Sequence, residues 1–229
     1  MNRIKNIFKK NLFFIWRITQ RPTIFLRKKK FELFMKIIKP KEHEKVIDVG
    51  VAIGNNLERG MNFFEVMYPY KSNLTALGIG NEKDSFEFKK IFPDINLIIG
   101  NGLNIPFEDN YFDIAFSNAV LEHVGTRENQ KKFISEIIRV SKRCFIATPN
   151  KWFPIELHTM LPIVHWLPDK LKYLIYKNTG NEFWADIKNL NLLSKKELVS
   201  LFPKNGNFYL IKKGIFFLNH NLIAVYCKK

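Results

Sequence analysis

The chain has 229 residues, enough for one domain with an appendage and a full hydrophobic core. Its apolar content of 46% and aromatic content of 14% are typical of a globular protein and exclude an intrinsically disordered chain. The net charge of +16 is concentrated in residues 1–45, which hold 14 Lys or Arg against 3 Asp or Glu. The remainder is only mildly basic, so most of the positive charge belongs to an N-terminal arm.

The cysteine content is low. Cys144 and Cys227 each lie in an apolar, strand-like run, with no spacing that suggests a disulfide framework. We therefore expect two small buried thiols in a reducing, cytoplasmic compartment. No His, Cys, Asp or Glu spacing predicts a metal site.

Residues 1–40 are predicted to form a basic amphipathic arm, followed by one domain over residues 41–229. Apolar residues of the arm recur at helical spacing up to Pro22, and a second such run follows through residues 31–38. The first run contains Ile4, Phe8, Leu12, Ile15 and Trp16. Its apolar stretch is too short to span a bilayer or to act as a secretory signal. Three interpretations of the arm remain open. It is a helix packed over the sheet edge, or a peripheral anchor on anionic lipid at the inner membrane face. The third, a nucleic-acid-binding segment, is least favoured because no nucleic-acid module is recognisable.

Residues 46–56 read VIDVGVAIGNN, a buried strand that ends in a glycine turn before a helix. Glycine suits this turn because the backbone bends sharply and approaches whatever binds there. Asp48 lies at the strand end, where a carboxylate can face an amino group or a hydroxyl. A dinucleotide fingerprint would place glycines at Ala52 and Asn55, so a nicotinamide oxidoreductase is disfavoured.

The elements that follow alternate between strand and helix. Helices are predicted at residues 57–67, 85–92 and 129–140, and strands at 74–79, 97–99, 111–117 and 143–147, the last ended by Thr148-Pro149-Asn150. Such alternation predicts an α/β, Rossmann-like doubly wound sheet that is mostly parallel, with helices on both faces. Ligands of such sheets bind beyond the carboxyl ends of the strands.

Residues 151–200 are predicted to form an insertion that caps the site. The run WFPIELHTMLPIVHWLP, with His158 and His165, is typical of an aromatic lid. A helix follows at residues 169–176, and Ser194 with Glu197 forms a candidate capping box for another. Runs at 208–217 and 222–227, joined by residues 218–221, predict a closing β-hairpin.

Two motifs resemble those of class I S-adenosylmethionine-dependent methyltransferases. The string Asp48-x-Gly50-x-Ala52-x-Gly54 is similar to their first motif, D-x-G-x-G-x-G. The segment from Leu103 to Val124, LNIPFEDNYFDIAFSNAVLEHV, closely resembles the methyltransferase type 11 group. The likeness covers residues 46–149. It implies a sheet with an antiparallel C-terminal strand, S-adenosylmethionine as cofactor and methyl transfer to a small molecule.

The resemblance also assigns residues to the cofactor. They are Asp48, Gly50, Val51, Ala52, Gly54, Gly80, Asn81, Glu82, Asn101, Gly102, Leu103 and Asn118. Gly80 stands where the family has an acid for the ribose hydroxyls, a loss of about 1.5–3 kcal/mol per charge-assisted hydrogen bond. Asn101 stands for an Asp, and its carbonyl oxygen can still accept from adenine. Glu82 is a candidate to replace the missing ribose acid.

His123 is the candidate catalytic residue. A hydroxyl acceptor must lose a proton near neutral pH, which suits histidine, and His123 follows the fourth strand of the parallel sheet. The alternative role for the Glu122-His123 pair is to shape the loop. We expect methylation of a small or membrane-associated metabolite, preferably at oxygen. The alternative is a non-catalytic scaffold that retains the fold and binds cofactor weakly.

Overall fold

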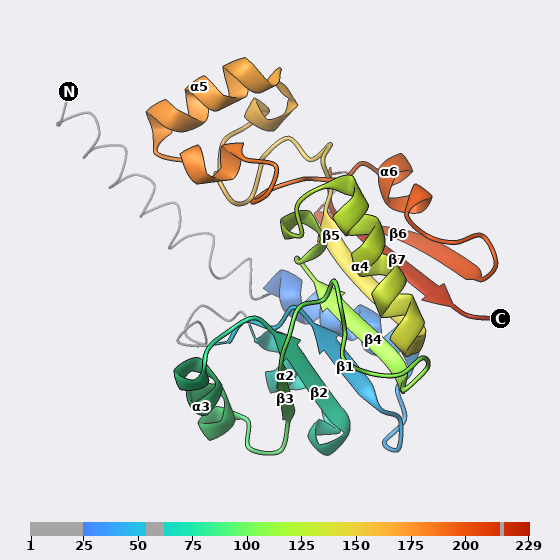
Figure 1. Cartoon of the computed structure of the whole chain (residues 1–229). Helices are drawn as coiled ribbons and strands as arrows, with labels where there is room; N and C mark the ends of the chain where they lie inside the picture. The colour runs from blue at the N-terminus through green and yellow to red at the C-terminus, as the bar shows by residue number, and fades with distance from the viewer. Residues whose placement is uncertain (1–24, 54–61, 216–217) are drawn as a thin grey trace.

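The computed structural model describes residues 25–53, 62–215 and 218–229. A seven-stranded sheet runs through its centre in the order β3-β2-β1-β4-β5-β7-β6 (Figure 1). The strands are β1 (Val46–Val49), β2 (Leu74–Gly78), β3 (Asn96–Ile99), β4 (Phe112–Asn118), β5 (Ser141–Pro149), β6 (Asn207–Ile215) and β7 (Leu218–Cys227).

Strands β1 to β5 pair in parallel, and β7 lies antiparallel between β5 and β6. The predicted doubly wound sheet with an antiparallel C-terminal strand is thereby confirmed. Buried β-branched and aromatic residues explain the central strands: all four residues of β1 are buried, as in a strand covered on both faces.

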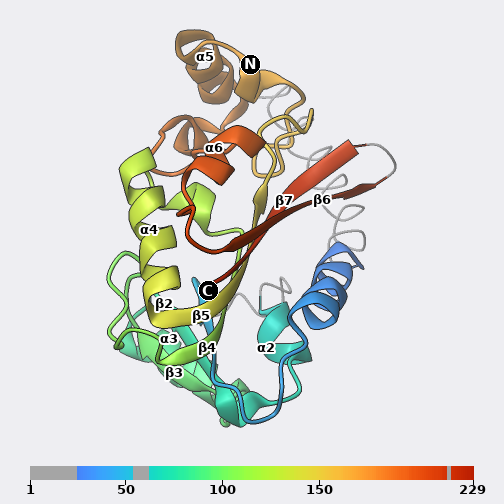
Figure 2. The ribbon, with the colours of Figure 1, turned by 90° about the vertical axis from the view of Figure 1, so that its right-hand side faces the viewer.

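Helices cover both faces of the sheet (Figure 2). They are a helix at residues 25–38, α2 (Phe63–Met67), α3 (Glu82–Ile91), α4 (Arg127–Val140), α5 (Asp169–Thr179) and α6 (Lys195–Ser200), with short 3-10 turns η2 (Lys71–Asn73), η3 (Leu121–His123), η4 (Val164–Trp166) and η5 (Glu182–Ala185). Helices α4 and α6 share one buried cluster with the sheet. The helix at 25–38, α2 and α3 share the other.

The second half of the predicted arm is part of the fold. Phe31, Phe34 and Ile38 are buried against the sheet, and the Phe34 ring makes edge contacts with Phe64 at 5.1 Å and Phe116 at 5.3 Å. This agrees with the packing interpretation, although the helix covers a face of the sheet and not its edge. Residues 1–24 lie outside the described residues.

Several boundaries differ from the sequence predictions. β5 continues through Thr148 and Pro149 because they pair with Leu222 and Asn221 of β7. Residues 218–221, predicted as the hairpin turn, belong to β7 for the same reason. The helix predicted at 85–92 begins at Glu82, since the Asn81 side chain caps it by accepting from the Asp84 amide. The first half of the helix predicted at 57–67 lies outside the described residues.

The capping box predicted for α6 is confirmed. The Ser194 hydroxyl accepts from the Glu197 amide, and the Glu197 carboxylate accepts from the Ser194 amide at 2.7 Å. Ser194→Ala is expected to lower the free energy of unfolding by about 0.5–2 kcal/mol, because one amide of the first turn loses its partner. Urea denaturation measures this. The exposed Ser72→Ala serves as the control, with an expected change within about 0.5 kcal/mol; equal effects of the two substitutions would contradict the capping role.

The predicted insertion forms a cap between β5 and α6. Asn150 and Leu193 form a parallel bridge where the cap leaves and rejoins the core. α6, the last part of the predicted insertion, packs Leu198 into the core cluster of α4. Within the described ranges, no helix is both long and apolar enough to cross a membrane.

Candidate active site

The order of the strands reverses between β1 and β4, which makes their carboxyl ends the topological switch point of the sheet. Asp48 of β1 lies level with Phe116 of β4, so Gly50, just after β1, and Asn118, the last residue of β4, lie at the same edge. The sheet thus brings together the predicted residues of the glycine turn and those after β4. The loops after β2 and β3 lie next along the same edge.

Asp48 is buried and faces Glu65 of α2. The two carboxyl groups share a hydrogen bond, and burial together with the Glu65 charge raises the pKa of Asp48 well above its ordinary value. Burial also raises the pKa of Glu65. Because two adjacent buried carboxyl groups repel each other when both are ionised, the pair favours retaining a proton.

Two buried acceptors near the glycine turn and in the carboxyl pair lack donors. Within the described part of the chain, Glu65 Oε1 and Asn62 Oδ1 have no hydrogen-bond partner. Asn62 donates its amide to the Ala52 carbonyl at 2.9 Å, which places it against the glycine turn. Unpaired buried acceptors cost free energy, so the site suits a ligand that brings N–H donors and positive charge. The ammonium group of an amino acid moiety meets both requirements.

The glycine turn depends on Gly50. Its φ of +97° is a conformation that side chains disfavour, and a Cβ there would lie 2.3 Å from Val120 Cγ2. The Gly50 and Val51 amides donate to the Leu77 carbonyl at 2.8 and 3.1 Å. Gly50 was predicted to leave its backbone accessible to a ligand. In the structure, a residue without a side chain is needed here for the positive φ of the turn and for close packing against Val120. Gly54 lies outside the described residues.

The residues after β2 offer few polar groups. Ile53 packs against Gly80, where a Cβ would lie 3.2 Å from the isoleucine side chain. The Asn81 side chain is engaged as the cap of α3. Glu82 is exposed in the first turn of that helix. Its proposed contact with a ribose stays a prediction.

After β3 the chain folds back on itself. Asn101 Oδ1 accepts from the Leu103 amide at 2.9 Å, and a Cβ on Gly102 would lie 2.5 Å from the Phe133 ring. Gly102 therefore lets the loop lie close against α4. Leu103 packs against the core on the same side.

Lys30 reaches the site from the N-terminal helix. Its ammonium donates to Asn118 Oδ1 at 2.5 Å, and the side chain is 7% exposed. Burial lowers the pKa of Lys30 to about 8, against the opposing effect of the Glu122 charge. Asn118 was predicted to contact cofactor; the structure shows its oxygen held by this lysine.

Glu122 and His123 lie in the 3-10 turn that follows β4. Glu122 is fully buried, and its Oε2 accepts from the Thr148 hydroxyl at 2.9 Å. His123 Nδ1 lies 2.7 Å from the Asn189 carbonyl. Since a carbonyl only accepts, Nδ1 carries the proton and Nε2 is left as the basic nitrogen.

The cap places a second histidine against the first. The His158 and His123 rings lie 4.8 Å apart at 89°, and Trp184 contacts both. His158 Nδ1 lies 2.6 Å from Glu156 Oε1, and the buried Glu156 carboxylate also accepts from the His158 and Thr159 amides. Glu156 thereby fixes both the turn and the orientation of the His158 ring.

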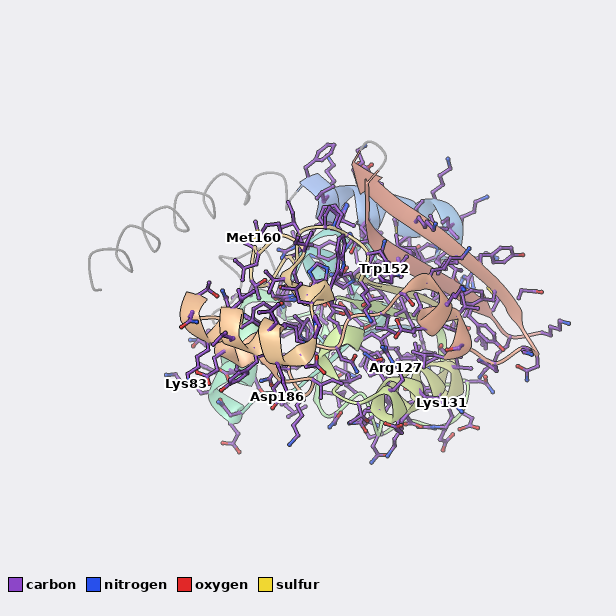
Figure 3. All side chains as sticks on the ribbon, turned by 90° about the horizontal axis from the view of Figure 1, so that it is seen from above. Lys83, Arg127, Lys131, Trp152, Met160 and Asp186 are labelled. Atoms are coloured by element: carbon purple, nitrogen blue, oxygen red, sulfur yellow. The ribbon has the colours of Figure 1, made fainter. Side chains whose placement is uncertain are left out.

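The cap is tied to the turn after β4 by buried amides. Gln130 of α4 donates to the Leu121 and Asn191 carbonyls, and the Asn191 side chain donates to the Gly125 carbonyl at 2.7 Å. The cap thus lies over the carboxyl end of the sheet, as the view from above shows at Met160 and Asp186 (Figure 3).

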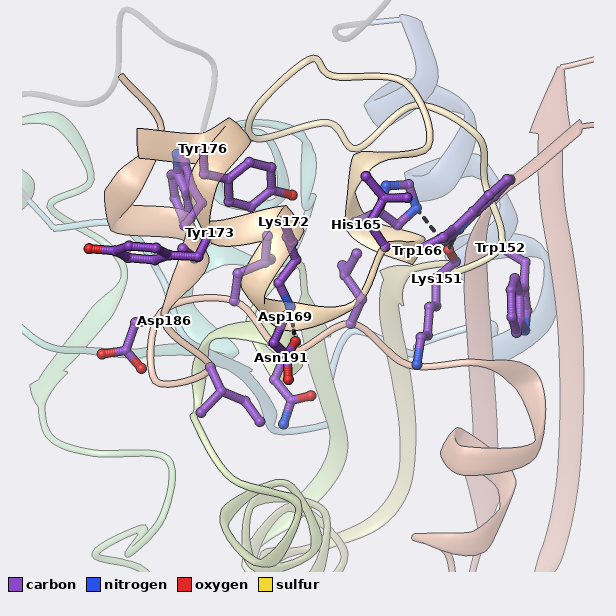
Figure 4. A pocket seen from close by; sticks show the side chains of 16 residues that line it. Lys151, Trp152, His165, Trp166, Asp169, Lys172, Tyr173, Tyr176, Asp186 and Asn191 are labelled. Carbon is purple, nitrogen blue, oxygen red and sulfur yellow. Dashed lines mark hydrogen bonds and ion pairs between the residues drawn. The ribbon is translucent and has the colours of Figure 1, made fainter. Parts of the chain in front are cut away.

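A cavity of about 680 Å³ lies inside the cap. Figure 4 shows aromatic side chains around it, among them Trp152, Trp166, Tyr173 and Tyr176. Trp184 lines it as well and contacts the rings of both histidines, so it lies between them and the cavity. His165, predicted in the lid, lies in its wall and contacts the Lys151 carbonyl at 2.9 Å.

Sequence reasoning missed Lys30, Asn62, Glu65 and Glu156. Lys30 was missed because it belongs to the basic run of residues 27–30, which suggested a solvated face. Its spacing with Phe34 and Ile38 nevertheless places it on the buried stripe of the helix. The spacing of apolar residues in the sequence gives no comparable signal for Glu65 or Glu156, because tertiary packing determines which side chains they contact.

Comparison with known proteins identifies the fold and the domain. Residues 47–144 match the family model described as a methyltransferase domain. The chain is 31% identical over 78 residues to a tRNA (carboxymethyluridine(34)-5-O)-methyltransferase of Arabidopsis thaliana, and 40% identical over 93 residues to that of Saccharomyces cerevisiae. These matches cover 34% and 40% of this chain. A 24-methylenesterol C-methyltransferase of A. thaliana is 27% identical over 130 residues, 55% of this chain.

The chain spans only 19%, 30% and 34% of the lengths of these relatives. Among solved structures, an S-adenosylmethionine-dependent methyltransferase of Thermotoga maritima aligns over 96% of this chain and 95% of its own, with a TM-score of 0.58 and 14% identity. A protein of Pyrococcus horikoshii OT3 aligns over 89% and 90%, with a TM-score of 0.58 and 18% identity. Residues 47–144 therefore resemble a methyltransferase domain, and the chain as a whole has the fold of these solved structures.

Proposed function

We propose that the protein transfers a methyl group from S-adenosylmethionine to an oxygen atom of a small or membrane-associated metabolite held in the cap cavity. The observation that carries this proposal is the position of His123. It follows β4 at the switch point and, through Trp184, borders the aromatic cavity. His123 thus lies between the carboxyl ends of β1 and β4, where the methyl donor is expected, and the cap cavity, which can hold an acceptor.

The cofactor supplies a methyl group on a positively charged sulfur. Asp48 and Glu65 would hold its ammonium end, and the unpaired Asn62 Oδ1 would be available to accept a further hydrogen bond. The cap lies over the carboxyl end of the sheet, where it would shield a bound acceptor from water and hold it near the donor.

His123 takes the proton of the acceptor hydroxyl. The Asn189 carbonyl fixes the tautomer, so Nε2 is free to accept, and Glu122 Oε1 at 3.9 Å stabilises the imidazolium that forms. The new C–O bond replaces the S–C bond, and the proton from oxygen stays on Nε2 until solvent removes it.

The acceptor class is tested with radiolabelled S-adenosylmethionine and two acceptor pools. A small-molecule extract from the source cells should accept label, and the same assay with total tRNA should not. Label in tRNA alone would contradict a metabolite acceptor. Label in neither pool, with the cofactor bound weakly, would favour a scaffold that retains the fold.

We also propose that residues 1–24 hold the protein at an anionic membrane surface on the cytoplasmic side, from their charge and apolar spacing alone. Full-length protein should sediment with anionic vesicles, and replacing Lys5, Lys9 and Lys10 by Gln should weaken this by about 3 kcal/mol, since each basic residue near the surface contributes about 1 kcal/mol. Vesicles without anionic lipid are the control. Equal partitioning of both proteins would end the anchor proposal.

A further inference from the structure

A second chemical feature lies where the cap meets the turn after β4. Glu122, His123 and His158 each offer one ligand atom, and these atoms lie within 4.8 Å of one another. Two of the residues come from the core and one from the cap, so the cluster forms only when the cap is docked.

Both imidazole rings are oriented in the manner of metal ligands. His123 Nδ1 faces the Asn189 carbonyl at 2.7 Å, and His158 Nδ1 faces the Glu156 carboxylate at 2.6 Å. Each Nδ1–H donates to its oxygen, which leaves Nε2 as the free nitrogen. Metal-binding histidines almost always donate their other N–H to a carboxylate or a backbone carbonyl.

The carboxylate at the centre lacks a partner. Glu122 is 0% exposed, its Oε2 is used by Thr148, and within the described residues its Oε1 accepts no hydrogen bond. His123 Nε2 lies 3.9 Å from this oxygen. The nearby Lys30 ammonium is bonded to Asn118. A buried carboxylate oxygen with no donor is costly, and a cation beside it removes that cost.

We propose that Glu122, His123 and His158 bind a divalent transition metal ion of the Mn²⁺ to Zn²⁺ series. Two imidazoles and one carboxylate suit these ions, and three protein ligands leave open positions for another oxygen. Ligand atoms about 2.1 Å from such an ion lie roughly 3.0–3.5 Å apart. From the present spacing of up to 4.8 Å the ligand atoms must therefore close by up to about 1.3–1.8 Å, a movement within the reach of side-chain rotations.

The open position lies beside Trp184 and the cap cavity. In the metal-loaded protein His123 is a ligand and no longer a base. A bound ion would supply Lewis acidity there, lowering the pKa of a coordinated acceptor hydroxyl. The metal site goes beyond the proposed methyl transfer, because its formation depends neither on the donor nor on the acceptor.

Titration of the metal-free, full-length protein with Co²⁺ tests this proposal, since ligation by nitrogen gives Co²⁺ a visible absorption band. We expect one ion per chain and a higher unfolding temperature on binding. Glu156→Gln should weaken binding about 10- to 100-fold, because it orients His158 from outside the ligand set. Glu122→Gln and His158→Gln should weaken it more. Exposed His43, remote from the cluster, provides the control His43→Gln, which should bind as the wild type does.

S-adenosylmethionine binding measured on the same variants shows whether each has folded and whether the cofactor site works without the metal. The metal site would be overturned if the wild type showed no absorption band with Co²⁺. It would also be overturned if the variants at Glu122 and Glu156 both bound Co²⁺ as tightly as the wild type. Neither result would affect the proposed methyl transfer.

Discussion

Replacing both Asp48 and Glu65 by their amides is expected to weaken S-adenosylmethionine binding about 10- to 150-fold. The double variant removes both carboxyl groups and with them the negative charge that the pair can present to the ammonium group. A charge-assisted hydrogen bond contributes about 1.5–3 kcal/mol, and about 1.4 kcal/mol corresponds to a factor of ten in affinity. Calorimetric titration with the cofactor measures the change.

Glu65→Gln alone is the matched control. In this variant Asp48 keeps the single charge, and the amide of the new residue can donate to it. We expect an affinity within about threefold of the wild type, less than 1 kcal/mol. If the single and double variants bind cofactor equally, the charge of the pair has no part in binding.

The same pair predicts a pH dependence of stability. Its carboxyl groups have raised pKa values in the folded protein, so the folded state retains protons that the unfolded chain releases. Their contribution is fully present below the ordinary carboxyl pKa of about 4 and is lost as the pH rises through the folded values. Glu65→Gln should therefore show a smaller fall in the free energy of unfolding between about pH 5 and pH 8 than the wild type; equal slopes would contradict the shared proton.

His123→Gln is expected to lower kcat about 100- to 10,000-fold, the usual contribution of a positioned base. Cofactor affinity should stay unchanged, because His123 lies on the acceptor side of the site. Single-turnover methyl transfer to the metabolite pool measures kcat, and calorimetry measures cofactor affinity.

His43→Gln, at an exposed position far from the site, is the control for histidine replacement. It should retain the wild-type rate. A His123→Gln variant that keeps the wild-type rate would leave the histidine with a structural role in the loop. Loss of cofactor binding as well would show that it supports the donor side.

The sheet could be predicted because each strand carries its own apolar signal and each helix its own period. Thr148 and Pro149 were misassigned for a physical reason. Proline is tolerated at this strand end, and pairing with β7, which comes more than 60 residues later, extends the strand there. Local pattern does not record such pairing.

Only the site residues in the glycine turn after β1 and at the carboxyl ends of the other strands could be predicted from the sequence. Asp48 was found from its place before Gly50, whereas its partner Glu65 depends on how α2 packs against β1. The same holds for His158, whose neighbour His123 is brought close by the docked cap. Contacts between distant segments follow from packing, and a single sequence contains no direct signal for them.

The central claim is that the residues at the carboxyl ends of β1 and β4 bind the amino acid end of S-adenosylmethionine. Calorimetric titration of the full-length protein with S-adenosylmethionine and, separately, with NADH tests it most directly. The account predicts one S-adenosylmethionine per chain and no binding of NADH. Absence of S-adenosylmethionine binding at saturating concentration, or tighter binding of NADH, would contradict it.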